Sequence, residues 1–519
     1  MTEKHAGSIR RAGVKNIAIS VVVAAATYYS LTLIAKQFGG SAGSDAYFFV
    51  LSLTTLASGL IGSLLGTVFL PAFVKLHSAA DKKEAHHFAS SILSWCVVMA
   101  CLIALPTSIW NEKFFLNVSR FDQSQIVQMH QILQYFAPIF VCGVLVEFFR
   151  VMALSLGMYT SAAVGALFPP FLLIGLISSL SNILHEEALV LSLLLGKVVA
   201  LIILVIVVVK SAGVRLHFNL KNNQHTFRFL KTSAPYWSAN VVTNAASFYF
   251  DYQASGLGQG VVTALAYAQR VFQLPTAIFL APIVEISRTK FSQFQASGDY
   301  ESFNQHYNKL ICFAIYFSVP MAVIYIAFSQ DIVSALFQRG AFNKDDVDLT
   351  ASLLRIYAWS IPFTSIFMVN GRACESYQRL FWPSIFGTIG NVMTIASAYF
   401  FVIIAGAQGV PIAKVFSEVI YMLPFGFLAT RLFGIRADHK SILQAVFISL
   451  FSSLTTLLIN FSMNWLFGVQ VKSSILWVLF VEIFVALSIY VLLLILISKN
   501  LRNLLISIFH KLTSKASVV

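Results

Sequence analysis

The stretch SSILWVLFVEIFVALSIYVLLLILI, residues Ser473 to Ile497, contains a single charged side chain, that of Glu482. A helix needs about 20 apolar residues to cross a hydrocarbon core of about 30 Å, so this stretch is long enough to span a membrane. Similar apolar stretches, separated by short polar breaks, fill the chain from about Val14 onward. The sequence therefore predicts an all-α membrane protein with about 14 transmembrane helices.

The longest inner polar break, residues 210–227, follows the sixth predicted span and separates two sets of six spans. We therefore expect an N-lobe in residues 1–212, a C-lobe in 213–440, two further spans in 441–498 and a basic amphipathic tail in 499–519. The predicted spans are 14–37, 46–74, 88–109, 126–155, 159–182, 187–210, 226–251, 260–287, 307–329, 349–372, 381–405, 408–431, 441–467 and 474–497.

The charges are few and unevenly distributed. Only 11% of the residues are charged, against roughly 25% in a soluble domain, and the net charge is +14. With the N-terminus inside, we place 25 Lys and Arg residues on the inner side and 6 on the outer side. This positive-inside bias predicts that both termini are cytoplasmic, and it explains the basic balance without a nucleic-acid partner. The first apolar run is long enough to span, so we expect no cleaved signal peptide.

The motifs of common enzymes are missing. The chain contains no Gly-x-x-x-x-Gly-Lys-Ser/Thr and no His-Glu-x-x-His, which argues against ATP-driven and zinc-hydrolase chemistry. Its five cysteines lie in apolar surroundings without metal-ligand spacing. We expect a protein that is not an enzyme and holds neither metal nor organic cofactor. A monovalent cation or a proton is the candidate coupling ion.

Charged residues inside spans are the candidate site residues. A charge at the centre of a membrane helix costs about 2.5–3.5 kcal/mol on insertion scales, so such a residue usually faces water or an opposite charge. Arg270 has no acidic residue within a helical turn, and its planar fork suits a phosphate. Lys197 and Arg355 are further candidates, for which snorkelling or structural pairing is the alternative. We therefore predict that these three residues contact an anionic substrate. For Arg270, a pair with a distant acid such as Asp251 is the alternative.

Other charged residues have simpler interpretations. Glu147 with Arg150, and Lys414 with Glu418, have the spacing of pairs on one helix face. Asp251 ends the seventh predicted span and precedes a glycine-rich turn. Its simple interpretation is a helix end. Asp251 with Asn391 as a second oxygen ligand is the alternative, a site for the coupling ion.

Four motifs resemble the MurJ (MviN) family of lipid II flippases. The most specific are ASGLGQGVVTALAYAQRVFQLP at 254–275 and LFQRGAF at 336–342; DAYFF at 45–49 and RACESYQR at 372–379 are looser. The resemblance implies two six-helix lobes that alternate in access around a cationic cavity, with a lipid-tail groove formed by the last two spans. It also implies that Arg270 and Asp45 occupy substrate-binding positions.

The chain departs from the family pattern in its first two spans. The family usually carries arginines in span one, but Val22 to Leu31 contains no basic residue, and Leu56 to Gly59 lacks an arginine that is frequent in span two. The resemblance implies a flippase for lipid II or another undecaprenyl-pyrophosphate-linked saccharide in the bacterial cytoplasmic membrane. Its partners would be the lipid-linked saccharide, membrane lipids and envelope-synthesis proteins, and we expect a monomer. A drug or metabolite exporter of the same superfamily and a non-transporting membrane scaffold stay open as alternatives.

Overall fold

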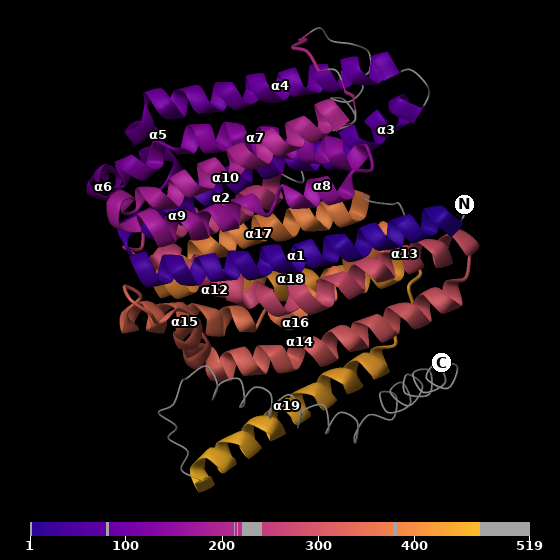
Figure 1. The fold of residues 1–519 in the computed structure, drawn as a ribbon. Coiled ribbons are helices and arrows are strands. Elements are labelled where there is room, and N and C mark those ends of the chain that lie inside the picture. The colour runs from indigo at the N-terminus through magenta and orange to yellow at the C-terminus, as the bar shows by residue number, and fades with distance from the viewer. Residues whose placement is uncertain are drawn as a thin grey trace, which may run out of the picture. The chain divides into compact units, whose positions relative to one another are not determined.

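The computed structural model describes residues 3–78, 82–211, 213–214, 216–220, 241–377 and 381–467. These residues form helices joined by short turns, and they contain no strand (Figure 1). Nine stretches of the described chain are long and apolar enough to cross a membrane, or ten if one bent helix pair counts as a span. The all-α membrane fold is confirmed, while the number fourteen stays a prediction. The predicted span 474–497 and the tail 499–519 lie outside the described residues.

Contacts divide the chain into two compact units. Unit 1 comprises Met1–Tyr267 with Phe337–Asp346, and unit 2 comprises Ala268–Leu336 with Val347–Val519. Two segments of unit 1 are therefore continuous with unit 2 along the chain: the end of the segment before Ala268, and the segment 337–346. The predicted lobes 1–212 and 213–440 stay a prediction.

Unit 1 is built from long helices packed side by side. Its α7 packs against α2, α4 and α10, while α9 packs against α1 and α10 (Figure 1). Residues 241–254 are also helical. The helices are α1 Glu3–Phe38, α2 Ala42–Leu64, α3 Leu70–Ser78, α4 Lys82–Ile109, α5 Asn111–Val118, α6 Gln123–Leu133, α7 Phe136–Ser155, α8 Tyr159–Val164, α9 Phe168–Leu184 and α10 Glu187–Ile206, with π-helical turns at Leu65–Phe69 and Val207–Ser211.

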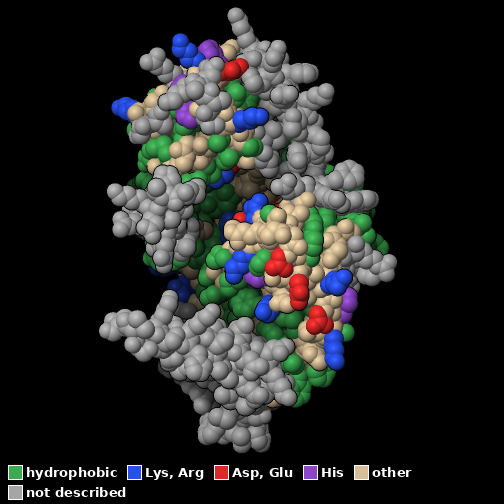
Figure 2. All heavy atoms as spheres, turned by 90° about the vertical axis from the view of Figure 1, so that its right-hand side faces the viewer, with side chains coloured by type: hydrophobic (Ala, Val, Ile, Leu, Met, Phe, Trp, Pro, Cys, Tyr) green, Lys and Arg blue, Asp and Glu red, His purple; other side chains and the backbone are tan. Residues whose placement is uncertain are grey.

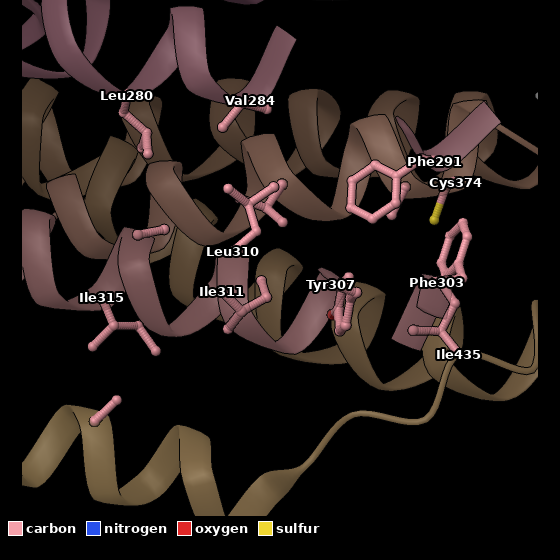
Figure 3. Close-up of a cluster of buried hydrophobic side chains, with 14 of the residues drawn as sticks. Leu280, Val284, Phe291, Phe303, Tyr307, Leu310, Ile311, Ile315, Cys374 and Ile435 are labelled. Atoms are coloured by element: carbon pink, nitrogen blue, oxygen red, sulfur yellow. The ribbon is translucent and has the colours of Figure 1, made fainter. Parts of the chain in front are cut away.

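Unit 2 holds the second helical set. Its helices are α12 Val261–Pro275 from Ala268 on, α13 Ala281–Ser297, α14 Tyr300–Phe337 up to Leu336, α15 Lys344–Ala358 from Val347 on, α16 Ile361–Glu375, α17 Phe381–Ala405, α18 Gly409–Leu432 and α19 His439–Phe467, with a π-helical turn Thr276–Leu280 and a 3₁₀ turn η4 Gly406–Gln408. Buried side chains of α13, α14 and α16, among them Phe291, Phe303 and Cys374, form its core (Figure 3). Lipid is as apolar as these side chains, so close van der Waals packing holds the helices together.

Two predicted spans are not single continuous helices. The predicted span 126–155 is two helices, because α6 ends at Leu133 and α7 begins at Phe136. The predicted span 349–372 lies across α15 and α16, which are bent by 47° relative to each other. Pro138 lies in the first turn of α7 and Pro362 in the first turn of α16. Proline is tolerated in a first turn but breaks a helix interior, so each proline lies where the helix after the break accepts it.

Polar caps and mixed charges mark the helix ends. Asp122 caps α6, and the Ser124 hydroxyl, followed by the Gln125 N–H, holds the pKa of this exposed carboxyl below its ordinary value.

Basic and acidic side chains are interspersed with hydrophobic ones on the face drawn in Figure 2. One example joins α13 to α16: Arg288 and Arg372 each pair with both Glu285 and Glu375, at distances from 2.8 to 3.6 Å. We call this four-residue network the α13–α16 ion-pair ring.

Candidate functional site

Asp45 caps a helix that follows it by more than 200 residues. Its side chain is fully buried, and it accepts hydrogen bonds from the Gly260 N–H at 2.5 Å, the Thr263 N–H at 2.8 Å and the Thr263 hydroxyl at 2.6 Å. These donors lie at the start of α12, where the backbone N–H groups have no preceding carbonyl of the same helix to bind. A carboxylate there satisfies the free N–H groups and interacts favourably with the positive end of the helix dipole.

Three of the resembling motifs meet around this carboxylate, all within unit 1. The Ala341 N–H donates to the Lys36 carbonyl at 2.8 Å, and the Tyr267 ring packs on those of Phe337 and Phe342. Gly340 has φ +59° and lies against Lys36, so a side chain there would collide with backbone. The turn after α1, the start of α12 and the segment 337–342 thus form one tightly packed group, which we call the Asp45 cluster.

The predicted ion ligands have partners of their own. Asp251 accepts a hydrogen bond from the Ser52 hydroxyl of α2 within unit 1. The side-chain amide of Asn391 donates to the Gly387 carbonyl at 2.8 Å within α17 of unit 2. Their role in holding a coupling ion stays a prediction.

Lys197 lies in the interior of unit 1. Its ammonium group on α10 lies beside Gly143 of α7, close enough that a Cβ at that glycine would approach it to 3.1 Å. Glu147, one turn further along α7, forms a two-bond pair with Arg150 at 2.6 and 2.8 Å. The predicted Glu147–Arg150 pair is therefore confirmed. Lys197 is thus a basic side chain of unit 1, in which Val22 to Leu31 contains no basic residue.

Arg270 and Arg355 both belong to unit 2. Arg270 lies half-buried on α12, and its neighbour Gln269 donates to the Tyr357 hydroxyl of α15 at 3.0 Å. Arg355 is exposed, and its Nε donates to the Ser329 hydroxyl of α14 at 3.2 Å. The contacts of these two residues with substrate stay predictions, as does that of Asp45.

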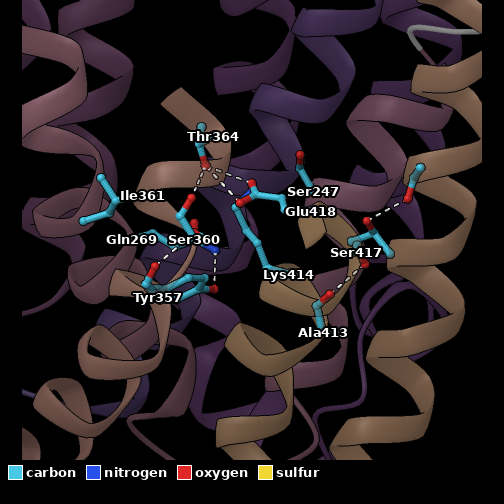
Figure 4. Close-up of polar contacts among 12 residues, drawn as sticks. Ser247, Gln269, Tyr357, Ser360, Ile361, Thr364, Ala413, Lys414, Ser417 and Glu418 are labelled. Carbon is cyan, nitrogen blue, oxygen red and sulfur yellow. Dashed lines mark hydrogen bonds and ion pairs between the residues drawn. The ribbon is translucent and has the colours of Figure 1, made fainter. Parts of the chain in front are cut away.

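A second polar group in unit 2 surrounds the Lys414–Glu418 pair, which is confirmed. Lys414 Nζ lies 2.5 Å from Glu418 Oε1, and the Thr364 hydroxyl of α16 lies 3.0 and 2.9 Å from the two Glu418 oxygens (Figure 4). Sequence reasoning missed Thr364, because it lies 54 residues before Glu418 and no sequence pattern indicates that the two are in contact. It also missed Gly260 and Thr263 as partners of Asp45, because they lie 215 and 218 residues further along the chain.

Comparisons with known proteins agree on one family. The family model described as "Lipid II flippase MurJ" matches residues 34–486. The probable lipid II flippase MurJ of Aquifex aeolicus is 23% identical over 74% of this chain and 76% of that protein. That of Thermotoga maritima is 27% identical over 34% of this chain. The chain spans 36% of the Thermotoga maritima protein and 32% of its relative from Thermosipho africanus.

Solved structures show the same fold. A structure titled "Lipid II flippase MurJ, inward closed conformation" matches with a TM-score of 0.79 at 20% identity, covering 93% of this chain and 99% of that one. An inward-facing multidrug resistance MATE family transporter of the MOP superfamily matches with a TM-score of 0.65 at 15% identity, covering 78% and 94% of the two chains.

Proposed function

Because the chain belongs to the lipid II flippase MurJ family, we propose that it moves an undecaprenyl-pyrophosphate-linked saccharide, lipid II or a related envelope precursor, across the bacterial cytoplasmic membrane. The head group of such a lipid is anionic and hydrated, so its transfer through hydrocarbon without compensating polar contacts is prohibitively costly. The protein replaces the lost water with its own donors while the lipid tail stays in the bilayer.

Arg270 is the residue that we assign to the pyrophosphate. A guanidinium presents paired donors in a fixed plane that matches two phosphate oxygens, and it keeps its charge at any physiological pH. Lys197 supplies positive charge from unit 1, where Val22 to Leu31 contains no basic residue. Arg355, in the last turn of α15, is a further candidate contact.

The observation that carries alternating access is the bonding of Asp45. The three hydrogen bonds hold the first turn of α12 in unit 1, while the same helix continues into unit 2 from Ala268. Moving the first turn of α12 away from α2 within unit 1 breaks these bonds, and restoring them re-forms the Asp45 cluster. A small set of charge-assisted bonds is suited to such a reversible closure, because each contributes only about 1.5–3 kcal/mol.

Further details complete the proposal. Both termini lie in the cytoplasm, the protein acts as a monomer, and its partners are the lipid-linked saccharide and bilayer lipids. A monovalent cation or a proton biases the cycle, and Asp251 and Asn391 are its candidate ligands. The positive-inside bias of the sequence supports the cytoplasmic position of both termini.

Complementation of a bacterial strain depleted of its lipid II flippase tests the proposal. The native chain should restore growth, and Arg270→Ala should fail although it reaches the membrane in equal amount. Arg436→Ala is the matched control, because this exposed arginine lies in the loop before α19, and it should rescue like the native chain. Failure of a well-expressed native chain would refute lipid II as the substrate, and rescue by Arg270→Ala would refute the role of the arginine.

A further inference from the structure

Thr364 has one hydroxyl proton and three acceptors within reach. Its Oγ1 lies 3.0 Å from the Ser360 carbonyl oxygen and 3.0 and 2.9 Å from the two oxygens of Glu418. When Glu418 is ionised, the hydroxyl donates to it, and the Ser360 carbonyl still accepts the Thr364 N–H at 2.9 Å. When Glu418 is protonated, it donates to Thr364 Oγ1, and the hydroxyl turns to Ser360. The same heavy-atom positions therefore accommodate both protonation states of Glu418.

The second partner of Glu418 is a cation that depends on it. Lys414 lies one turn before Glu418 on α18, so each side chain has an opposite charge beside it. The two side chains are 30% and 17% exposed, so the pair is accessible from outside the helix packing. Protonation of Glu418 leaves Lys414 as a single charge inside the membrane region, which is costly without a new anion. A phosphate oxygen in contact with Lys414 restores neutrality.

Among the described helices of unit 2 that pack against α18, none offers a substitute carboxylate. Neither α17 nor η4 contains a charged residue. The charged residues of α16, Arg372 and Glu375, belong to the α13–α16 ion-pair ring. Tyr357 and Gln269, which lie beside the pair in Figure 4, hydrogen-bond to each other, and the one charge of α12 is the basic Arg270.

We propose that Glu418 takes up one proton when Lys414 exchanges this carboxylate for a phosphate oxygen of the lipid-linked head group. The inference rests on the proposed function and adds a proton-linked anion site to it. The proton comes from water and returns to water when the head group leaves, so Lys414 has an opposite charge beside it in both the empty and the loaded protein. Lys414 is then never an unpaired charge when the protein changes between its two access states, whether empty or loaded.

The test measures binding of farnesyl-pyrophosphoryl-N-acetylglucosamine to the full chain in detergent micelles between pH 6 and pH 8. Both phosphates of this diester keep one negative charge throughout this range, so the probe itself does not titrate. The dissociation constant of the native chain should fall by up to tenfold for each pH unit of acidification. Calorimetry in buffers of different ionisation enthalpy should show up to one proton taken up per probe bound.

Variants separate Glu418 from other groups. Glu418→Gln should bind at every pH as tightly as the native chain does in acid, without proton uptake, whereas Lys414→Gln should bind weakly at every pH. Glu301→Gln, an exposed carboxylate at the start of α14, should keep the native pH dependence. A pH slope that survives Glu418→Gln would overturn the proposal. The proton count on the native chain requires no variant, so a misfolded variant does not remove the test.

Two outcomes distinguish this inference from the proposed function on which it rests. Binding of the probe without proton uptake would overturn the proton link and leave the flippase proposal standing, whereas no binding at any pH would defeat both. Sulfate is the second probe, because it carries charge without tail or sugar. Equal proton-linked binding of millimolar sulfate would assign the site to free anions and overturn its link to the lipid head group.

Discussion

Replacing Asp45 by alanine tests the Asp45 cluster directly. The substitution removes the acceptor of three hydrogen bonds, with donor–acceptor distances of 2.5, 2.6 and 2.8 Å. Two of the donors are buried backbone N–H groups at Gly260 and Thr263, and each buried donor without a partner costs about 1–3 kcal/mol. The expected loss is therefore about 4 kcal/mol. Thr263→Val is the matched variant, because it removes one of the three bonds and should cost about 1 kcal/mol.

Thermal unfolding of the full chain in detergent, followed with a thiol-reactive dye, measures this difference. Cys96 is a buried free thiol of unit 1, so the dye reacts with it when the unit opens. On the scale of a 250-residue unit, 1 kcal/mol shifts the Tm by about 2–4 °C, which predicts a fall of roughly 10 °C for Asp45→Ala and about 3 °C for Thr263→Val. A Tm for Asp45→Ala within 2 °C of the native value, or above that of Thr263→Val, would refute the reasoning.

Three further perturbations have defined outcomes. Gly340→Ala should lower the Tm more than Gly298→Ala, because both residues have positive φ but only Gly340 has backbone, that of Lys36, in the way; equal shifts would contradict the packing argument. Arg372→Gln opens the half-exposed α13–α16 ion-pair ring and should lower the free energy of unfolding by about 1 kcal/mol at low salt. Unfolding at 0.5 M salt should largely abolish this difference, because salt screens exposed charges. A difference that persists at 0.5 M salt would contradict the ion-pair account. The folded-state pKa of Asp122 is lowered, so its capping contribution is present above the ordinary pKa and disappears as the pH falls through the lowered one. The Tm difference between the native chain and Asp122→Ala should therefore vanish in acid, and a difference that stays constant down to pH 2 would contradict the assignment.

Apolar length and charge predicted the class of fold, since both depend on local composition. The stretches 14–37 and 187–210 lie on α1 and α10 almost as expected, because hydropathy in lipid decides where a helix forms. The breaks before α7 and α16 were missed although proline marks both. Within an apolar run, sequence alone does not show whether proline bends one span or separates two helices.

The candidate site was predictable only where it is local. The Lys414–Glu418 pair follows from a spacing of four residues on one helix. The partners of Asp45 lie 215 and 218 residues further along the chain, and Thr364 lies 54 residues from Glu418. Such contacts depend on how the helices pack, which the pattern of a single sequence does not determine. The motifs at Asp45, 254–275 and 336–342 come together because each supplies part of one packed cluster.

Transport itself is the most direct test. Purified protein is reconstituted into vesicles that contain a fluorescent lipid II analogue, and a membrane-impermeant quencher reports how fast the analogue appears in the outer leaflet. The native chain and Arg436→Ala should accelerate the loss of fluorescence well beyond protein-free vesicles, and Arg270→Ala should not. Loss of fluorescence at the protein-free rate with correctly folded native protein would contradict the account.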